Sequence, residues 1–361
     1  MTRPTREPDY VVIDRNGVIE NRHQLHVAVV DGRGTLLFYT GDPSRVTLVR
    51  SAAKPAQSVA VAETGALEKY GYDEADLAIM CASHSSEPGH AARVTDMLAK
   101  SGSVEAELQC GAHPAHLPDR HHAWLRAGFE PTPIWSNCSG KHAGMLAACR
   151  ALGVDTANYH HLDHPLQLRI QRVTEEMGGL TPKDVQWAVD GCNLPAPAYP
   201  LAALAQTNVA LARAADATER EDEAMTPREK TMARVFNAMT AYPEMVAGEG
   251  RFCTRFMRVY KGQAIGKLGA DACYGIGIRE SEETRRLGAV GPIGIAAKIE
   301  DGNIDVMYGA LVEILERFQL GTPEMRGELD MYHKQSVKNT RGIVTGRISY
   351  PFVLRKPEGV V

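Results

Sequence analysis

The spacing of apolar residues divides the chain into two kinds of segment. Residues 10–14 and 26–40 alternate or run apolar and are rich in β-branched and aromatic residues, and the sequence Asp-Gly-Arg-Gly at 31–34 supplies a turn within the second run. This pattern predicts an N-terminal β-hairpin or meander. From about residue 56 to residue 241 the pattern changes to Ala- and Leu-rich helical stretches, which Pro- and Gly-rich loops separate.

Strand-like patterns return after residue 252. We expect strands at 256–260, 264–268, 274–278, 293–299 and 304–308, a hairpin turn at 300–303 and a helix at 310–318. Strands at both ends with helices between them predict an α/β protein of the α+β type. One antiparallel sheet would form from residues of about 9–50 and 252–355, with a mainly helical region of about 51–250 inserted. We expect residues 1–361 to form a single catalytic unit.

Composition narrows the class of protein. The 361 residues are 44% hydrophobic and 23% charged, and the formal net charge is −4. These values are typical of a soluble globular chain and give no electrostatic reason to expect nucleic acid or an anionic membrane as a partner. The first nine residues lack the apolar core of a signal peptide. We therefore expect a cytoplasmic protein whose seven cysteines are reduced thiols.

The first candidate for chemistry is a serine followed three positions later by a lysine, Ser51 and Lys54. Positions i and i+3 lie on one face of a helix, so the two side chains could hydrogen-bond directly. Pro55 is tolerated only in the first turn of a helix. This places Ser51 at or near a helix N-terminus, where the helix dipole favours negative charge. The apolar stripe that follows predicts one helix that ends near Gly71.

Two further elements follow in the order used by penicillin-recognising enzymes, S-x-x-K, S-D-N and K-T-G. Ser83 belongs to a serine-rich loop, and Lys267 lies in a K-x-G sequence at the end of a predicted strand. A lysine acts as a base only when it is neutral, and burial and a nearby ammonium both favour the neutral form. Lys54 and Lys267 facing each other across Ser51 and Ser83 would each help the other to lose its proton. This combination predicts a serine hydrolase.

A second cluster combines Cys138 and Lys141 with Asp190 and Cys192, which lie in Ser- or Gly-rich segments. Neither cysteine belongs to a C-x-x-C motif. From spacing alone, two ordinary buried thiols therefore remain an alternative to a metal site.

Five segments together resemble the class 3 L-asparaginases of the rhizobial type. They are Ser51-Ala52-Ala53-Lys54-Pro55, Cys81-Ala82-Ser83-His84, Asn137-Cys138-Ser139-Gly140-Lys141-His142, Asp190-Gly191-Cys192 and Gly266-Lys267-Leu268-Gly269. The resemblance extends from the N-terminal hairpin to Gly302. It implies a serine β-lactamase-like fold, a homodimer, and hydrolysis of L-asparagine to L-aspartate and ammonia through a serine acyl-enzyme.

The resemblance also implies roles for single residues. Two catalytic serine–lysine pairs would form, Ser51 with Lys54 and Ser83 with Lys267. A zinc ion near the substrate would be bound by Cys138, Lys141 and Cys192, with the lysine as a neutral amine.

Three side chains are expected to contact the substrate. Arg50 would bind the α-carboxylate, because a carboxylate needs a cationic partner. Asp190 would accept from the ammonium group or contact zinc-bound water, and His142 completes the predicted substrate site.

Alternatives remain open at this point. A glutaminase, or a β-lactamase or peptidase-like serine hydrolase, would share the S-x-x-K sequence, although Ser83-His84-Ser85 replaces S-D-N and Leu268 replaces the threonine of K-T-G. The roles of Ser51 and Ser83 could be exchanged. A non-enzymatic zinc-binding interaction protein is a further alternative, but it gives no reason for two lysines beside two serines.

Overall fold

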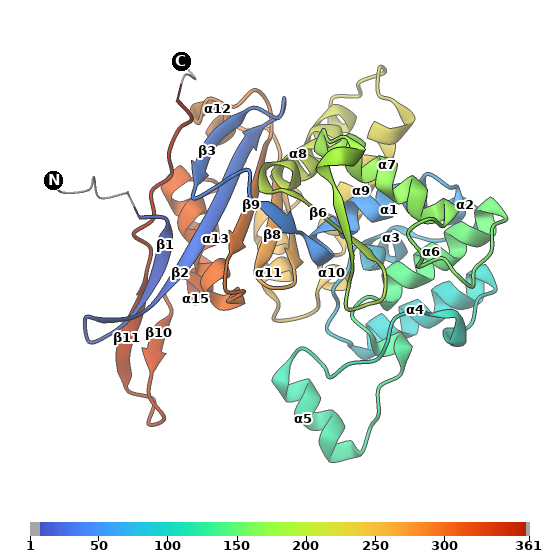
Figure 1. Cartoon of the computed structure of the whole chain (residues 1–361), viewed down its shortest axis with the longest axis horizontal. Coiled ribbons are helices and arrows are strands. Elements are labelled where there is room, and N and C mark those ends of the chain that lie inside the picture. Colours follow the sequence, from blue (N-terminus) through green and yellow to red (C-terminus); the bar gives the residue numbers. More distant parts are fainter. Residues whose placement is uncertain (1–7, 359–361) are drawn as a thin grey trace.

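The computed structural model describes residues 8–358, in which a sheet region lies beside a mainly helical region (Figure 1). The strands are β1 (Tyr10–Arg15), β2 (Val18–Asp31), β3 (Leu36–Thr40), β4 (Val46–Leu48), β5 (Gln186–Val189), β6 (Pro195–Pro200), β7 (Ala264–Gly269), β8 (Cys273–Ile278), β9 (Ile293–Ile299), β10 (Ser336–Lys338) and β11 (Val344–Ser349). The α-helices are α1 (Lys54–Ala62), α2 (Ala66–Tyr70), α3 (Glu74–Met80), α4 (Pro88–Ser101), α5 (Pro118–Ala127), α6 (Ser139–Leu152), α7 (Pro165–Gly178), α8 (Leu201–Glu219), α9 (Pro227–Ala241), α10 (Pro243–Val246), α11 (Phe252–Tyr260), α12 (Glu282–Arg286), α13 (Ile304–Phe318), α14 (Pro323–Gly327) and α15 (Asp330–His333). Short 3-10 helices are η1 (Arg50–Ala53), η2 (Glu105–Glu107), η3 (Pro133–Trp135) and η4 (Pro182–Asp184).

Both ends of the chain build the large sheet. Its strand order is β10-β11-β1-β2-β9-β8-β7, with β3 also paired to β2, and all neighbours are antiparallel. The long strand β2 joins the two parts, because its first half pairs with β1 and its second half pairs with β9 and β3. The mixed architecture, with an antiparallel sheet made from both termini and helices between them, agrees with the predicted α+β class.

Helix α8 packs closely on one face of this sheet because the facing positions are glycines. A Cβ added to Gly294 of β9 would lie 2.0 Å from the Ala205 carbonyl oxygen of α8, and one added to Gly277 of β8 would lie 2.4 Å from the Asn208 carbonyl oxygen. Successive side chains of a strand point to opposite faces. The alternate residues Ile293 and Ile295 of β9 accordingly join the apolar cluster that includes residues of α13.

The segment after Ser51 begins as expected and ends earlier than expected. Helix η1 runs directly into α1, whose first turn contains Pro55. However, α1 ends at Ala62, because Gly65 adopts a left-handed φ of 75° before α2 starts. Gly71, also left-handed, ends α2. The prediction of one continuous helix was therefore wrong, although Gly71 does end a helix.

Two predicted strands are helices. Residues 256–260 belong to α11, whose buried residues Phe252, Phe256 and Tyr260 repeat every four positions, a helical period that a window starting at 256 hides. Residues 304–308 form the start of α13, not a hairpin strand. Asn303 caps this helix by accepting a hydrogen bond from Val306 N–H.

A small sheet in the middle region was not predicted. Strands β4, β6 and β5 pair in that order, and the tight turn between β5 and β6 is closed by a hydrogen bond from Asp190 N–H to the Leu194 carbonyl. Val49 N–H, just before η1, donates to the Pro197 carbonyl of β6. This sheet therefore fixes the loop of Asp190 and Cys192 beside Ser51.

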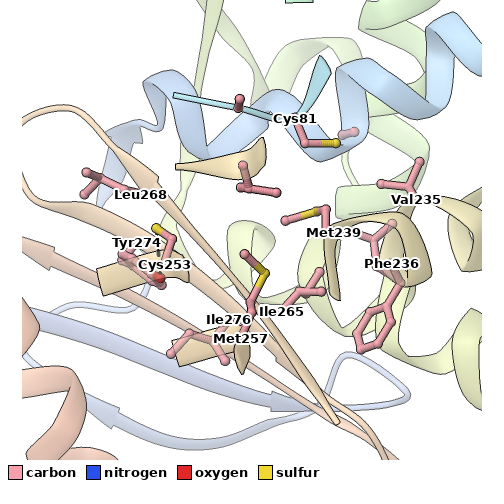
Figure 2. Close-up of a cluster of buried hydrophobic side chains, with 14 of the residues drawn as sticks. Cys81, Val235, Phe236, Met239, Cys253, Met257, Ile265, Leu268, Tyr274 and Ile276 are labelled. Carbon is pink, nitrogen blue, oxygen red and sulfur yellow. Dashed lines mark hydrogen bonds between the residues drawn. The ribbon is translucent and has the colours of Figure 1, made fainter. Parts of the chain in front are cut away.

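An apolar cluster joins the end of the sheet to the helices (Figure 2). It contains Ile265 and Leu268 of β7, Tyr274 and Ile276 of β8, Cys253 and Met257 of α11, Val235, Phe236 and Met239 of α9, and Cys81 after α3. The Tyr274 hydroxyl donates to Cys253 Sγ at 3.2 Å. Strand β7, which carries Lys267, is thus held on a close-packed apolar base.

Two further expectations concern the chain as a whole. Residues 1–7, on which the prediction of no signal peptide largely depends, lie outside the described residues. None of the described helices combines the length and the apolar character needed to cross a membrane. All seven cysteines are buried and form no disulfide; that they are reduced thiols in the cell stays a prediction.

Candidate active site

The two predicted serines line one cavity of about 620 Å³. The elements around it are η1, the loop after α3, the start of α11, the turn between β7 and β8, and α13. Its lining includes Ser51, Ser83, His116, Asn137, Arg251, Leu268, Asp271, Asp305, Tyr308 and Tyr332. Segments separated by more than two hundred positions therefore meet at this cavity.

Ser83 lies between two buried lysines. Its Oγ is 2.9 Å from Lys267 Nζ and 3.2 Å from Lys54 Nζ. Both lysine side chains are almost fully enclosed, with 1% and 0% exposure. The remaining hydrogen bonds of the two ammonium groups go to the carbonyl oxygens of Leu268 and Ala82 and to Cys138 Sγ. Neither lysine has a carboxylate partner among the described residues.

This environment changes the ionisation of Lys267. Burial and the neighbouring charge of Lys54 lower the pKa of Lys267 from 10.5 to about 7. An amine with such a pKa is neutral in roughly half of the molecules at pH 7 and can then accept a proton. The two lysines flank the hydroxyl of Ser83 alone, whereas the prediction placed them across both Ser51 and Ser83.

Ser51 and Lys54 are arranged differently from the direct pair that the spacing suggested. Ser51 lines the cavity, while the hydrogen bonds of Lys54 Nζ go to Ala82, Ser83 and Cys138. The reason is that residues 50–53 form a 3-10 helix, which sets Ser51 in a different turn geometry from that of α1. Lys54 therefore reaches across to the loop of Ser83.

Arg50, next to Ser51, is held by two carboxylates. Its Nε is 2.6 Å from Asp190 Oδ1, and its Nη1 is 2.9 Å from Asp271 Oδ2. The backbone of Arg50 has a left-handed φ of 51°, a conformation that costs of order 1–3 kcal/mol for a residue with a Cβ. Burial alone would raise the pKa of Asp190, but the charges of Lys141 and Arg50 outweigh this and lower it.

The three predicted metal ligands also converge. Lys141 Nζ donates to Cys192 Sγ at 3.2 Å, and Lys54 Nζ donates to Cys138 Sγ at 3.0 Å. The two thiols lie close enough for each to shift the ionisation of the other. The interaction with Cys138 and the charge of Lys141 lower the pKa of Cys192 to about 5, whereas the interaction with Cys192 and burial raise the pKa of Cys138 to about 12. The positive charge of Lys141 therefore favours the thiolate form in this pair of cysteines.

Two members of this set match zinc by their chemistry, since thiolate sulfur is a preferred zinc ligand. Lys141 does not, because an ammonium group cannot ligate a metal. Burial alone would lower its pKa, but the neighbouring Cys192, Cys138 and Asp190 outweigh this and raise it. Within residues 8–358, no group of three or more His, Cys, Asp and Glu side chains could hold a metal. The predicted set contains only two such residues, since its third member is a lysine.

His142 lies away from the cavity. It is fully buried on α6, where its Nδ1 is 2.5 Å from the Tyr159 hydroxyl. Burial and the charge of Lys141 lower the pKa of His142 to about 3, so the ring is neutral. It is not among the described residues that line the cavity, and its predicted substrate contact stays a prediction.

Sequence reasoning did not find several residues that line the cavity. Arg251 follows the sequence Gly-Glu-Gly at 248–250 and is the extended residue just before α11. His116 Nε2 is 2.6 Å from Asn137 Nδ2, and burial and the charge of Arg251 lower the pKa of His116 to about 4. The only available signal was an arginine in a Gly-rich turn before a helix, which is common in surface turns.

A larger cavity of about 900 Å³ lies elsewhere, between α1, α7, α8 and α9. Several of its charged lining residues pair with one another. Arg228, for example, binds Glu63 and Glu176, and Arg169 is 3.5 Å from Glu63. It contains neither serine–lysine group, so the smaller cavity is the candidate active site.

No curated protein matches the chain. The family model described as L-asparaginase II matches residues 11–350, a range that contains both serines, both lysines and the whole lining of the cavity. The chain therefore belongs to the L-asparaginase II family.

Proposed function

We propose that this protein hydrolyses the side-chain amide of L-asparagine, giving L-aspartate and ammonia through a serine acyl-enzyme. The observation that carries the proposal is the Ser83 hydroxyl, held between two buried lysines in the cavity that Ser51 also lines. Family membership supports the asparaginase activity. The Ser-Lys mechanism is a proposal from the geometry.

Ser51 Oγ attacks the amide carbon, and its proton passes through the Ser83 hydroxyl to neutral Lys267. The lowered pKa of Lys267, caused by burial and the charge of Lys54, makes it the proton acceptor. As the C–N bond breaks, the acceptor returns this proton to the leaving nitrogen, and ammonia departs. Water then adds to the aspartyl ester, and the serine hydroxyl re-forms when L-aspartate leaves.

Lys54 has an electrostatic role in this scheme. Its charge near Lys267 favours the neutral amine there. It also donates to Ser83 Oγ at 3.2 Å, so it stabilises negative charge on that oxygen while the proton is transferred.

Zinc is proposed as a cofactor held by Cys138, Lys141 and Cys192. When bound, it would supply a fixed positive charge beside the substrate. Lys141 must lose its proton to become a ligand, and the thiolate of Cys192 would then bind the metal in place of that ammonium group. Asp190, which binds Arg50, would face its water shell.

The fold type, the cellular location, the oligomeric state and the substrate-binding residues are also proposals. A serine β-lactamase-like fold is consistent with an antiparallel sheet from both termini and a helical region between them. Cytoplasmic location and a homodimer rest on the sequence and on the resemblance. Of the binding residues, Asp190 and Arg50 lie beside Ser51, while His142 is enclosed by α6 and Tyr159.

The test is ammonia release from L-asparagine by the wild type and by Ser51→Ala and Ser83→Ala. Both variants should lose activity by roughly 10²–10⁴-fold or more, because they remove the nucleophile or the proton path. Ser101→Ala is the control, since Ser101 is a buried serine at the end of α4 outside the cavity. Full activity of Ser51→Ala and Ser83→Ala would refute the serine mechanism.

Single-variant rates do not tell the two serines apart, because members of one catalytic unit are not additive. Rapid acid quenching followed by peptide mass mapping identifies the serine that carries the aspartyl group. An adduct on Ser83 would exchange the two roles. Parallel assays with L-glutamine and a chromogenic β-lactam separate asparaginase activity from the alternative hydrolases.

A further inference from the structure

A zwitterionic amino-acid substrate needs a cation for its α-carboxylate, and arginine is well suited because it can form two parallel hydrogen bonds. Two arginines lie near the serines. Arg50 precedes Ser51 in the chain, and Arg251 lines the cavity together with Ser51 and Ser83. Their hydrogen-bond partners differ.

Arg50 is already neutralised by two carboxylates. Its Nε binds Asp190 at 2.6 Å, and its Nη1 binds Asp271 at 2.9 Å. A substrate carboxylate at this guanidinium would meet the negative charge of both side chains, which disfavours binding. Arg50 is better placed to shape the site than to bind an anion.

Arg251 has no carboxylate partner among residues 8–358. Its Nη1 donates to Ser85 Oγ at 3.1 Å, and the Tyr308 hydroxyl, which lines the same cavity, lies close enough for the charge of Arg251 to act on it. Both hydroxyl groups are neutral. The guanidinium therefore keeps its full positive charge at the cavity wall and has donors left for a ligand.

Hydrogen bonds between two loops fix the position of Arg251 relative to Ser83. Ser83 N–H donates to the Val246 carbonyl at 2.9 Å, and Ser85 Oγ donates to the Ala247 carbonyl at 2.8 Å. Gly248 takes a φ of 108° in this turn, and a Cβ there would lie 2.7 Å from Glu87 Oε1. Because the two loops are tied together, the arginine is positioned before the substrate arrives.

We propose that Arg251 is the specificity-determining residue of this site and binds the α-carboxylate of the substrate. The inference rests on the proposed amidohydrolase function and defines its substrate class as small amides that carry a carboxylate. Arg251 contacts the end of the substrate away from the scissile bond. Amides that lack the carboxylate therefore lose this contact and react slowly.

The experiment compares two substrates across variants. L-Asparagine carries the carboxylate, and 3-aminopropanamide has the same amine and amide without it. Arg251→Gln should lower kcat/KM for L-asparagine by roughly 10–150-fold, the range expected for a hydrogen bond to a charged group. Most of this loss should appear in KM. Since the charge of Arg251 also lowers the pKa of Lys267, a smaller loss common to both substrates is expected.

The controls separate binding from folding. Arg255→Gln alters an exposed arginine on α11, the helix that follows Arg251, and should leave the rates with both substrates unchanged. Arg251→Lys keeps the positive charge but lacks the planar guanidinium that forms two parallel hydrogen bonds. It should therefore recover part of the preference for L-asparagine that Arg251→Gln loses. Arg50→Gln, measured in parallel, should change the ratio of the two substrates much less than Arg251→Gln.

Equal losses on both substrates in Arg251→Gln would overturn the inference, because the residue would then act only through the loop or through Lys267. The inference would also be overturned if Arg50→Gln, rather than Arg251→Gln, lost the preference for L-asparagine over 3-aminopropanamide. No ammonia release by the wild type from L-asparagine would overturn the proposed function and this inference together, which distinguishes the two failures.

Discussion

Replacement of Lys267 by methionine is expected to make the protein more stable and inactive. Lys267 is 1% exposed, and burial together with the charge of Lys54 lowers its pKa from 10.5 to about 7. Below pH 7 the folded protein therefore buries a charged amine at a cost in free energy. Methionine has a similar length and carries no charge, so it removes this cost and also removes the proton acceptor.

The pH dependence of the free energy of unfolding gives the size of this cost. A base whose pKa falls on folding binds fewer protons in the folded state, so the free energy of unfolding of the wild type rises with pH between about 7 and 10.5. From these two pKa values, the cost of burying Lys267 is about 4 kcal/mol at pH 7 and about 2 kcal/mol at pH 9. The hydrogen bonds of Lys267 to Ser83 and Leu268 offset part of this cost.

The assay is urea unfolding followed by tryptophan fluorescence for the wild type, Lys267→Met and Lys183→Met at pH 7 and pH 9. Lys183 is exposed and serves as the control. The stability advantage of Lys267→Met should shrink by about 2 kcal/mol between the two pH values. The groups whose charges act on Lys267 remain in both proteins and largely cancel in the difference: Lys54, Cys253, Arg251 and Cys138. The reasoning would be refuted if the difference in free energy of unfolding between Lys267→Met and the wild type did not change with pH, or were larger at pH 9.

Three further predictions concern packing, metal and charge. Gly294→Ala should lower the free energy of unfolding by about 1–3 kcal/mol, because its Cβ would collide with the Ala205 carbonyl, whereas Gly89→Ala, which meets nothing within 4 Å, should lower it by much less or raise it. Equal effects in urea unfolding would contradict the packing of α8. Cys192→Ala should reduce the zinc bound per chain after dialysis, measured by plasma mass spectrometry, and an unchanged zinc content would count against the proposed site. Asp76→Asn should lower the free energy of unfolding by about 2–4 kcal/mol, since this fully buried carboxylate pairs with two cations; a change below about 0.5 kcal/mol would be inconsistent with that.

The strands of the central sheet could be predicted because their apolar runs are short and bounded by turns. Strands β7, β8 and β9 lie within a residue or so of the expected ranges. Helices α11 and the start of α13 were missed, since five apolar-rich residues fit either period. Only the cap at Asn303 and the repeat from Phe252 to Tyr260 distinguish them.

The residues of the site were found because they occur in recognisable short motifs. How they contact one another was harder to predict. That Lys54 donates to Ser83 rather than to Ser51 depends on a 3-10 turn and on a loop 29 residues away. The left-handed backbone of Arg50 and the charge of Arg251 at the cavity leave no periodic signal in the sequence. Tertiary packing decides such features.

The pairing of β2 with β9 also has a consequence for biosynthesis. Val27 lies opposite Ala297, and at roughly 5–20 residues added per second the ribosome takes about 15–50 s to reach the partner strand. During this time the apolar second half of β2 has only β3 as a paired strand. A nascent chain released after Lys267 but before β9 begins at Ile293 would carry both serines and both lysines but would expose an unpaired strand edge. We expect such a fragment to aggregate or bind chaperones rather than to retain partial activity.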